Sequence, residues 1–280
     1  MAADADFLMQ SLREVDPDRH LSILYAPSDK RDALAALYLF NGDIAAIRDR
    51  VREPLPGEMR IQWWRDALAA SESAAAGHPV AEALRRAISC YRLPLDAFEH
   101  YLDARVFDLY DDPMPSRSDL EGYCGETASA IIQLAALILD PKAAASFSEA
   151  AGHAGCAQAI AGLLLLLPLH RSRGQCYVPN DVLAAAGTDR DGFLAGIDTT
   201  AIERVLSAMV ALGREHVTKF EQAAQGMPAG LRPAFLPASL ATVNLNLVSR
   251  RGADALQRTD NLSPLRKHWI MLRRALRGWG

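Results

Sequence analysis

Four side chains that could bind an anion follow Pro168. A proline removes a backbone donor and clashes with the preceding turn, so a helix that reaches residue 167 should end or kink there. The polar side chains that come next are His170, Arg171, Arg173 and Tyr177. Two guanidinium groups and an imidazole that converge would bind a phosphate or a carboxylate, and Tyr177 could close the site or simply pack. The alternative is a solvated loop held by structural ion pairs, and these residue types fit both interpretations.

Carboxylates occur at two other places that could do chemistry. Asp49 lies between Arg48 and Arg52, and this spacing on a helix favours an intrahelical charge pair over a metal ligand. The other close cluster precedes a proline and consists of Asp108, Asp111 and Asp112. A helix end that leads into a loop is a poor frame for two opposed metal sites, so this cluster is the weaker candidate.

The last predicted helix is basic and amphipathic. Its apolar residues follow 4, 3, 4, 3 spacing and are Leu265, Trp269, Leu272, Leu276 and Trp279. Its other face carries Arg266, Lys267, Arg273, Arg274 and Arg277. A helix of this kind can lie on an anionic membrane or dock against a partner. The alternative is a terminal helix that packs on the core with its arginines in solvent.

Helices must position all of these side chains. Alanine and leucine dominate, apolar residues recur at helical spacing, and period-two runs of Val, Ile and Thr are almost absent. We therefore predict an all-α fold, with Ser28 or Asp29 as the N-cap of a helix that Pro54 and Pro56 end. The predicted helices cover 28–52, 57–68, 79–92, 94–111, 117–139, 142–167, 180–186, 190–196, 200–225, 230–249 and 263–279, with a small-residue loop at 71–77 and an irregular segment at 170–179.

Composition and charge exclude several classes of protein. The 30 basic and 34 acidic residues give a net charge of −4, which argues against a nucleic-acid binder. Half of the residues are hydrophobic, enough for a large core, and no repeat or linker divides the chain, so we expect one domain over residues 1–280. The acidic first twenty residues do not resemble a targeting leader, and the longest apolar run, 159–169, is too short to span a bilayer. The cysteines should be reduced and buried, since they form no C-x-x-C pair: Cys90, Cys124, Cys156 and Cys176.

Common catalytic motifs are absent from the sequence. It contains no Walker loop, no G-x-G-x-x-G, no H-E-x-x-H and no G-x-S-x-G. Two glycine pairs stand in helical context and indicate close helix packing rather than phosphate binding: Gly122 with Gly125, and Gly152 with Gly155.

Three stretches, read together, carry a family resemblance. They are SILYAPSDKRDALAALYLFN at 22–41, EGYCGETASAIIQLAALIL at 121–139, and GCAQAIAGLLLLLPLHRSRGQCYVPNDVL at 155–183. Their order and spacing resemble the squalene/phytoene synthase family. The resemblance implies a helical barrel in which two allylic diphosphates condense head to head, with Mg²⁺ on aspartates assisting the departure of diphosphate.

This sequence departs from the family where the metal would bind. The resemblance places the first aspartate motif on Ala45, Ala46 and Asp49, and the second on Leu166 and His170. Only Asp49 keeps a carboxylate, and it stands beside a positive charge. We therefore expect no metal and no cofactor, with Mg²⁺ relevant only if the protein is an active prenyl transferase.

A subset of the family shares this loss and is more similar still. The matching stretches are FNGDIAAIRDRV at 40–51, MRIQWW at 59–64 and PLHRSRGQCYVP at 168–179. That subset comprises assembly factors of respiratory complex I (NADH dehydrogenase) and their bacterial relatives. The resemblance implies a non-catalytic member of the family, a pseudoenzyme, that helps to build complex I.

The resemblance sets the remaining expectations for this chain. We expect an isoprenoid-synthase-like helical barrel, located in the cytoplasm and peripheral on the inner face of the membrane. Its partners would be NADH dehydrogenase subunits, together with a prenyl or lipid chain in a central apolar cavity, and not nucleic acid. The alternatives are an active synthase whose carboxylates lie elsewhere, and a prenyl-lipid binder without turnover.

Overall fold

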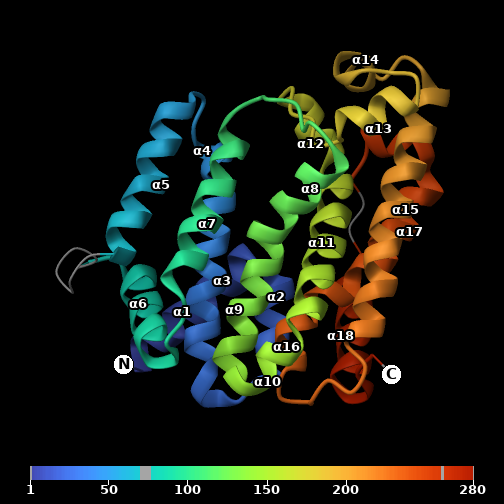
Figure 1. Cartoon of the computed structure of the whole chain (residues 1–280). Helices are drawn as coiled ribbons and strands as arrows, with labels where there is room; N and C mark the ends of the chain where they lie inside the picture. The colour runs from blue at the N-terminus through green and yellow to red at the C-terminus, as the bar shows by residue number, and fades with distance from the viewer. Residues whose placement is uncertain (1, 70–76, 260–261, 280) are drawn as a thin grey trace.

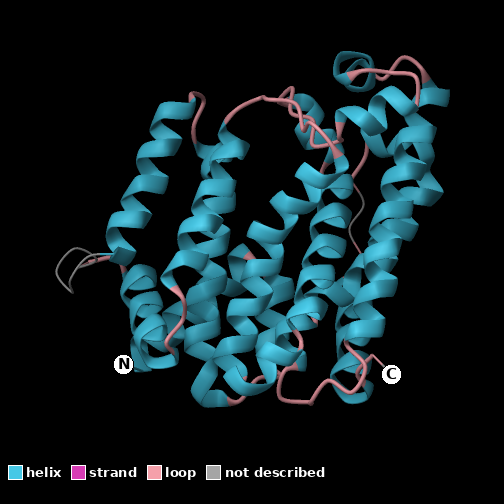
Figure 2. Cartoon of the chain, viewed as in Figure 1, coloured by secondary structure: helices cyan, strands magenta, loops and turns pink. Residues whose placement is uncertain are grey.

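The described part of the chain consists of helices and loops, and no strand occurs in it (Figure 2). The computed structural model describes residues 2–69, 77–259 and 262–279. The prediction of an all-α fold is confirmed.

The helices follow the predicted order along the chain, with additional breaks. They are α1 Ala2–Val15, α2 Pro17–Ile23, α3 Arg31–Ala45, α4 Ile47–Arg50, α5 Pro54–Ala69, α6 Pro79–Tyr91, α7 Leu95–Val106, α8 Arg117–Cys124, α9 Ala130–Leu139, α10 Pro141–Ser146, α11 Ser148–Leu165, α12 Leu167–Ser172, α13 Asn180–Ala185, α14 Arg190–Ala195, α15 Thr199–Ala223, α16 Arg232–Phe235, α17 Ala241–Arg251 and α18 Pro264–Arg277. Short 3-10 turns or a π turn join several of them: Ser28–Lys30, Phe107–Leu109, Gly125–Ser129, Pro237–Leu240 and Gly252–Leu256.

Two clusters of buried apolar side chains form the core of the described residues. Phe40 is central to the first, where its ring lies 5.0 Å from that of Trp64 and 5.3 Å from that of Tyr101. The second is built mainly from α11, α15 and α17 and includes Val205 and Met209 of α15. Burying each large side chain stabilises the fold by roughly 1.5–3 kcal/mol. Long helices therefore run alongside one another, with α4, α12 and α14 at one end of the bundle (Figure 1).

The helix predicted over 28–52 has a different start and an interruption. Ser28 begins a 3-10 turn, and α3 begins after Lys30 without a side-chain cap, so the predicted caps are wrong. A turn at Ala46 separates α3 from α4. Pro54 was expected to end this helix but instead begins α5, because a proline is well tolerated in a first helical turn.

The helix predicted over 142–167 is also interrupted, at Phe147 and again at Leu166. The second break precedes Pro168, which lies in the first turn of α12. α12 continues to Ser172, so His170 lies on a short helix and not in the predicted irregular segment. Helices α1 and α2 were not predicted, and the predicted loop at 71–77 lies almost entirely outside the described residues.

One glycine lets two central helices approach closely. A Cβ on Gly155 would lie 2.3 Å from the backbone nitrogen of Ser129. Nothing lies within 4 Å of a Cβ built on Gly122, Gly125 or Gly152, so the close-packing prediction holds for Gly155 alone. Three of the cysteines are buried as predicted, whereas Cys90 is exposed.

One helical stretch, Arg117–Leu139, is long and apolar enough to cross a membrane by length and composition alone. Just over half of its most apolar window, 56%, is buried inside the protein. A core helix of a bundle has the same composition, and the stretch packs against α11 and α7 here.

Candidate functional site

A partly buried carboxylate organises the polar interior at one end of the bundle. Asp108 lies in the 3-10 turn that ends α7, and its side chain is only 13% exposed. One of its oxygens accepts hydrogen bonds from the hydroxyls of Tyr123 and Tyr177, both at 2.8 Å. Its other oxygen accepts from Nη1 of Arg105 at 2.9 Å. All three donors are directed at one carboxylate, so Asp108 is fully partnered.

The two tyrosines of this cluster remain protonated donors. Burial raises the pKa of Tyr123 and of Tyr177 well above the usual value, and the neighbouring Asp108 raises them further. The Tyr123 hydroxyl also accepts from Nη1 of Arg105 at 3.1 Å. The backbone carbonyl of Asp108 accepts from Nε2 of Gln175 at 3.0 Å. The cluster is a closed set of hydrogen bonds, which we call the Asp108 cluster: Arg105, Asp108, Tyr123, Gln175 and Tyr177.

His170 packs beside this cluster as a neutral imidazole. Its ring lies 4.8 Å from the ring of Tyr177, and the residue is 8% exposed. Burial lowers the pKa of His170 to about 4, although the nearby Asp108 acts in the opposite direction. His170 therefore adds no positive charge to an anion site at neutral pH.

The predicted anion-binding arginines separate in the structure. Arg171 donates to the carbonyl of Leu194 at 2.6 Å and to that of Ala195 at 2.8 Å, so it caps the end of α14. Arg173 instead forms an ion pair with Asp49 at 2.5 Å. The predicted intrahelical pairing of Asp49 is wrong, because the guanidinium of Arg173 occupies the carboxylate. Arg48 donates to the carbonyl of Arg52 and lies 3.3 Å from Asp111.

The positions where the family would bind metal lack suitable ligands. Ala45 ends α3 and Ala46 forms the turn after it, while Leu166 forms the corresponding turn after α11. None of these side chains carries an oxygen, and His170 is packed against Tyr177. Among the described residues, no three His, Cys, Asp or Glu side chains are placed to hold a metal ion. The residues present do not fit Mg²⁺, which requires several hard oxygen ligands.

A pocket of about 500 Å³ begins beside one of these positions. Leu166 lines it together with Gly162 of α11, and segments of α2, α17 and α18 complete the wall. Oε1 of Gln158, a further lining residue, is buried without a hydrogen-bond partner in the described protein. The other lining residues combine apolar side chains with charged groups at α2 and α18: Asp16, Asp18, Arg19, Ala161, Leu165, Pro237, Leu240, Ala241, Asn244, Thr259, Leu262 and Lys267.

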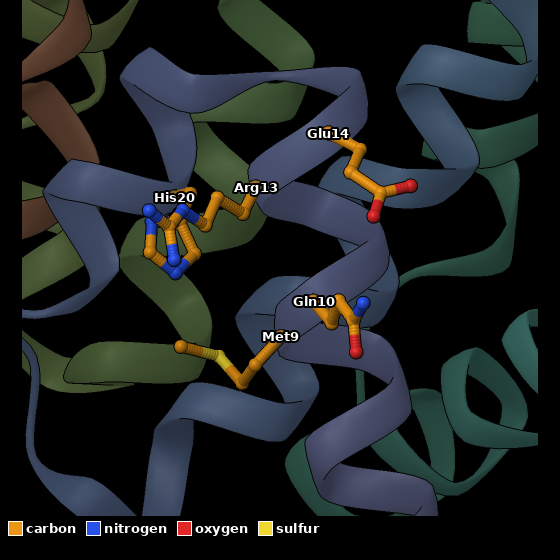
Figure 3. Close-up of a pocket in the computed structure, with 5 residues that line it drawn as sticks. All are labelled: Met9, Gln10, Arg13, Glu14 and His20. Atoms are coloured by element: carbon orange, nitrogen blue, oxygen red, sulfur yellow. The ribbon is translucent and has the colours of Figure 1, made fainter.

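A second hollow of about 530 Å³ lies between α1 and α2 and is more polar. Figure 3 shows its lining, in which the Arg13 side chain extends toward the His20 ring while Glu14 points away from both. Burial lowers the pKa of His20, and the charge of Arg13 lowers it further. The remaining lining residues are Met9 and Gln10.

The predicted surface on α18 is divided between the protein and the solvent. Arg266, Trp269, Arg273 and Arg277 are exposed. Lys267 and Arg274 face the protein, where they form ion pairs with Asp18 and Glu221.

Two members of the Asp108 cluster, Arg105 and Gln175, were not predicted from the sequence. The i, i+3 spacing of Arg105 and Asp108 was a local signal for their pairing.

Comparison with known proteins assigns the family. The squalene/phytoene synthase family matches residues 12–269 of this chain. The chain belongs to that family. Among solved structures, a dehydrosqualene synthase superposes with a TM-score of 0.81 at 17% identity, covering 97% of this chain and 95% of the other. A squalene synthase from Alicyclobacillus acidocaldarius gives a TM-score of 0.74 at 19% identity, covering 89% and 94%. The fold is thus the isoprenoid-synthase-like helical fold, as predicted.

In amino-acid sequence, this chain is similar to assembly factors of complex I. Complex I assembly factor 6 (NADH dehydrogenase, ubiquinone) of Rattus norvegicus is 29% identical over 264 residues, which are 92% of this chain and 79% of that protein. The protein of the same name from Homo sapiens is 27% identical over the same shares. The Drosophila melanogaster homologue is 24% identical over 281 residues, covering 96% and 83%.

Proposed function

We propose that this protein acts in the assembly of respiratory complex I and does not condense prenyl diphosphates. The observation that carries the proposal is similarity to complex I assembly factor 6 over 92% of the chain. The loss of metal-binding side chains at Ala45, Ala46 and Leu166 supports the same conclusion, because a synthase needs carboxylates there to neutralise the departing diphosphate.

The carboxylates that remain are poor substitutes for the missing ones. Asp49 is paired with Arg173, and Asp108 accepts hydrogen bonds from Arg105 and two tyrosines. Binding Mg²⁺ at either position would require breaking an ion pair. The alternative of an active synthase with relocated carboxylates therefore has little support from the geometry.

We propose that the pocket beside Leu166 receives a prenyl or lipid chain. Leucine at this position adds apolar surface where a carboxylate would repel a hydrocarbon, and the pocket volume is sufficient for part of such a chain. A Cβ on Gly162 meets nothing within 4 Å, so Gly162→Leu should fill the pocket without a clash. We expect farnesol to raise the melting temperature of the wild type and not that of Gly162→Leu. Gly152→Leu is the matched control, because Gly152 also has free space but does not line the pocket. An equal response of all three proteins would contradict a ligand in this pocket.

The proposed partners are NADH dehydrogenase subunits, which this protein contacts at the inner face of the membrane. The test is deletion of the gene in its own organism. We expect NADH:ubiquinone reductase activity in membranes and assembled complex I on native gels to fall together. The wild-type gene should restore both, and so should Asp49→Ala, because the proposed role does not use this carboxylate for metal binding. Complex I at normal levels in the deletion strain would overturn the proposal, and loss of isoprenoid products instead would favour the synthase alternative.

A further inference from the structure

Most of the predicted apolar stripe of α18 faces the solvent rather than the core, whereas Trp279 follows the helix and is buried against Phe220. At about 100° per residue, four side chains fall within about 60° of one another around the helix: Leu265, Trp269, Leu272 and Leu276. Leu265 is 85% exposed, Trp269 is 67% exposed and Leu276 is 72% exposed, while Leu272 is half-buried. We call these four residues the α18 stripe. A contiguous apolar surface of this kind is unusual on a folded protein. Where it occurs, it commonly marks an interaction surface.

The opposite face of α18 fixes the helix in this orientation. Met271 is completely buried, and Nζ of Lys267 lies 2.8 Å from a carboxylate oxygen of Asp18 on α2. Nη1 of Arg232 donates to the carbonyls of Ala275 and Leu276 at 2.8 and 3.0 Å, which satisfies the end of the helix. The Arg274–Glu221 ion pair adds a further attachment. Turning the α18 stripe inward would break all of these contacts.

Three arginines lie along one side of the α18 stripe. Arg266, Arg273 and Arg277 project within about 40° of one another, next to Trp269 around the helix. All three are exposed, and none forms an ion pair with a residue that the structure describes. The chain as a whole has a charge of −4, so this positive surface is local.

We propose that the α18 stripe and its three arginines dock on an anionic phospholipid bilayer. A helix lying in the interface inserts leucine and tryptophan side chains into the headgroup and acyl boundary, while arginines beside them contact lipid phosphates. The unpaired charges of a single sign complement an anionic surface. This inference rests on the proposed function only for the statement that the protein meets a membrane. It deepens that proposal by identifying which surface of the protein contacts the membrane.

The test is flotation of the full chain with vesicles of phosphatidylcholine alone or mixed with phosphatidylglycerol. We expect binding to the mixed vesicles, weakened by salt because salt screens the arginines. Trp269→Ala combined with Leu276→Ala should weaken binding by about tenfold or more, since two exposed apolar side chains are removed. Arg266→Gln combined with Arg273→Gln should have an effect of similar size.

Matched controls separate docking from general surface changes. Leu55 and Met59 on α5 are 66% and 67% exposed, and replacing both by Ala should leave vesicle binding unchanged. Arg86→Gln combined with Arg250→Gln removes the same charge from other exposed helix surfaces. Absence of binding to mixed vesicles, or an equal effect of test and control variants, would overturn the proposal. So would a wild-type dimer that the Trp269→Ala, Leu276→Ala variant converts to a monomer, because the α18 stripe would then join two copies of the chain.

The two proposals fail in distinguishable ways. Vesicle binding lost in the α18 variants, together with normal complex I in a deletion strain, overturns only the assembly role. Complex I that depends on the gene, together with a wild type that does not bind mixed vesicles, overturns only the docking surface.

Discussion

Replacing Asp108 by Ala should destabilise the protein severely. The substitution leaves the largely buried guanidinium of Arg105, which is 16% exposed, without its carboxylate and removes the acceptor of Tyr123 and Tyr177. Removing one partner of a buried ion pair costs about 3–5 kcal/mol. For a chain of this size, 1 kcal/mol lowers the melting temperature by about 2 °C, so we expect a fall of about 6–10 °C in a calorimetric or circular-dichroism melt.

The control is the same substitution three residues further along the chain. Asp111 is 47% exposed and lies 3.3 Å from Arg48, an exposed pair of the kind that contributes about 0–1 kcal/mol. Asp111→Ala should therefore lower the melting temperature by about 2 °C or less. Equal shifts for Asp108→Ala and Asp111→Ala would refute the conclusion that Asp108 is the structural centre of this site. A small shift for Asp108→Ala that grows when Arg105 is also replaced by Met would refute it as well.

Two further predictions concern His170 and the central glycines. Because the pKa of His170 is about 4 when folded and 6.5 when unfolded, its stabilising contribution is complete above pH 6.5 and is lost as the pH falls toward 4. This loss amounts to about 3 kcal/mol, so urea melts from pH 7 to 4 should show a shallower decline for His170→Gln than for the wild type, and parallel declines would contradict it. Gly155→Ala should cost about 2 kcal/mol or more, since its Cβ would lie 2.4 Å from the Cα of Ser129. In the same melts Gly152→Ala should be neutral or stabilising by up to about 1 kcal/mol, and a comparable loss in both variants would be inconsistent with the close approach at Gly155 alone.

The elements that rest on local signals were predictable from the sequence. The 3.6-residue apolar period located α15, and Val205, Met209 and Phe220 on this helix are buried. Proline was a weaker guide, because the same ring that breaks a helix interior is favoured in a first turn. Pro54 and Pro168 accordingly lie in the first turns of α5 and α12, directly after the helix breaks that were predicted there.

The partners within the site depend on contacts between distant segments. Asp49 had a local arginine at helical spacing, yet its partner is Arg173, which only the packing of α4 near α12 brings close. Likewise the hydroxyls of Tyr123 and Tyr177 reach Asp108 from different segments. The amphipathic period of α18 correctly grouped Leu265, Trp269 and Leu276 on one side, but it also placed Trp279 there, which is buried beyond the end of the helix. Periodicity cannot tell whether an apolar side meets the core or the solvent. Two ion pairs and the contacts of Arg232 with two carbonyls on the opposite face decide the orientation.

The measurement that tests the central claim most directly is diphosphate release. Purified protein would be incubated with farnesyl or geranylgeranyl diphosphate and Mg²⁺, beside Asp49→Ala and an active squalene synthase. Since Ala45, Ala46 and Leu166 offer no metal ligand, we predict release at background for both the wild type and Asp49→Ala, while the synthase releases diphosphate. Release by the wild type well above background, abolished in Asp49→Ala, would show that this chain condenses prenyl diphosphates and would contradict the account.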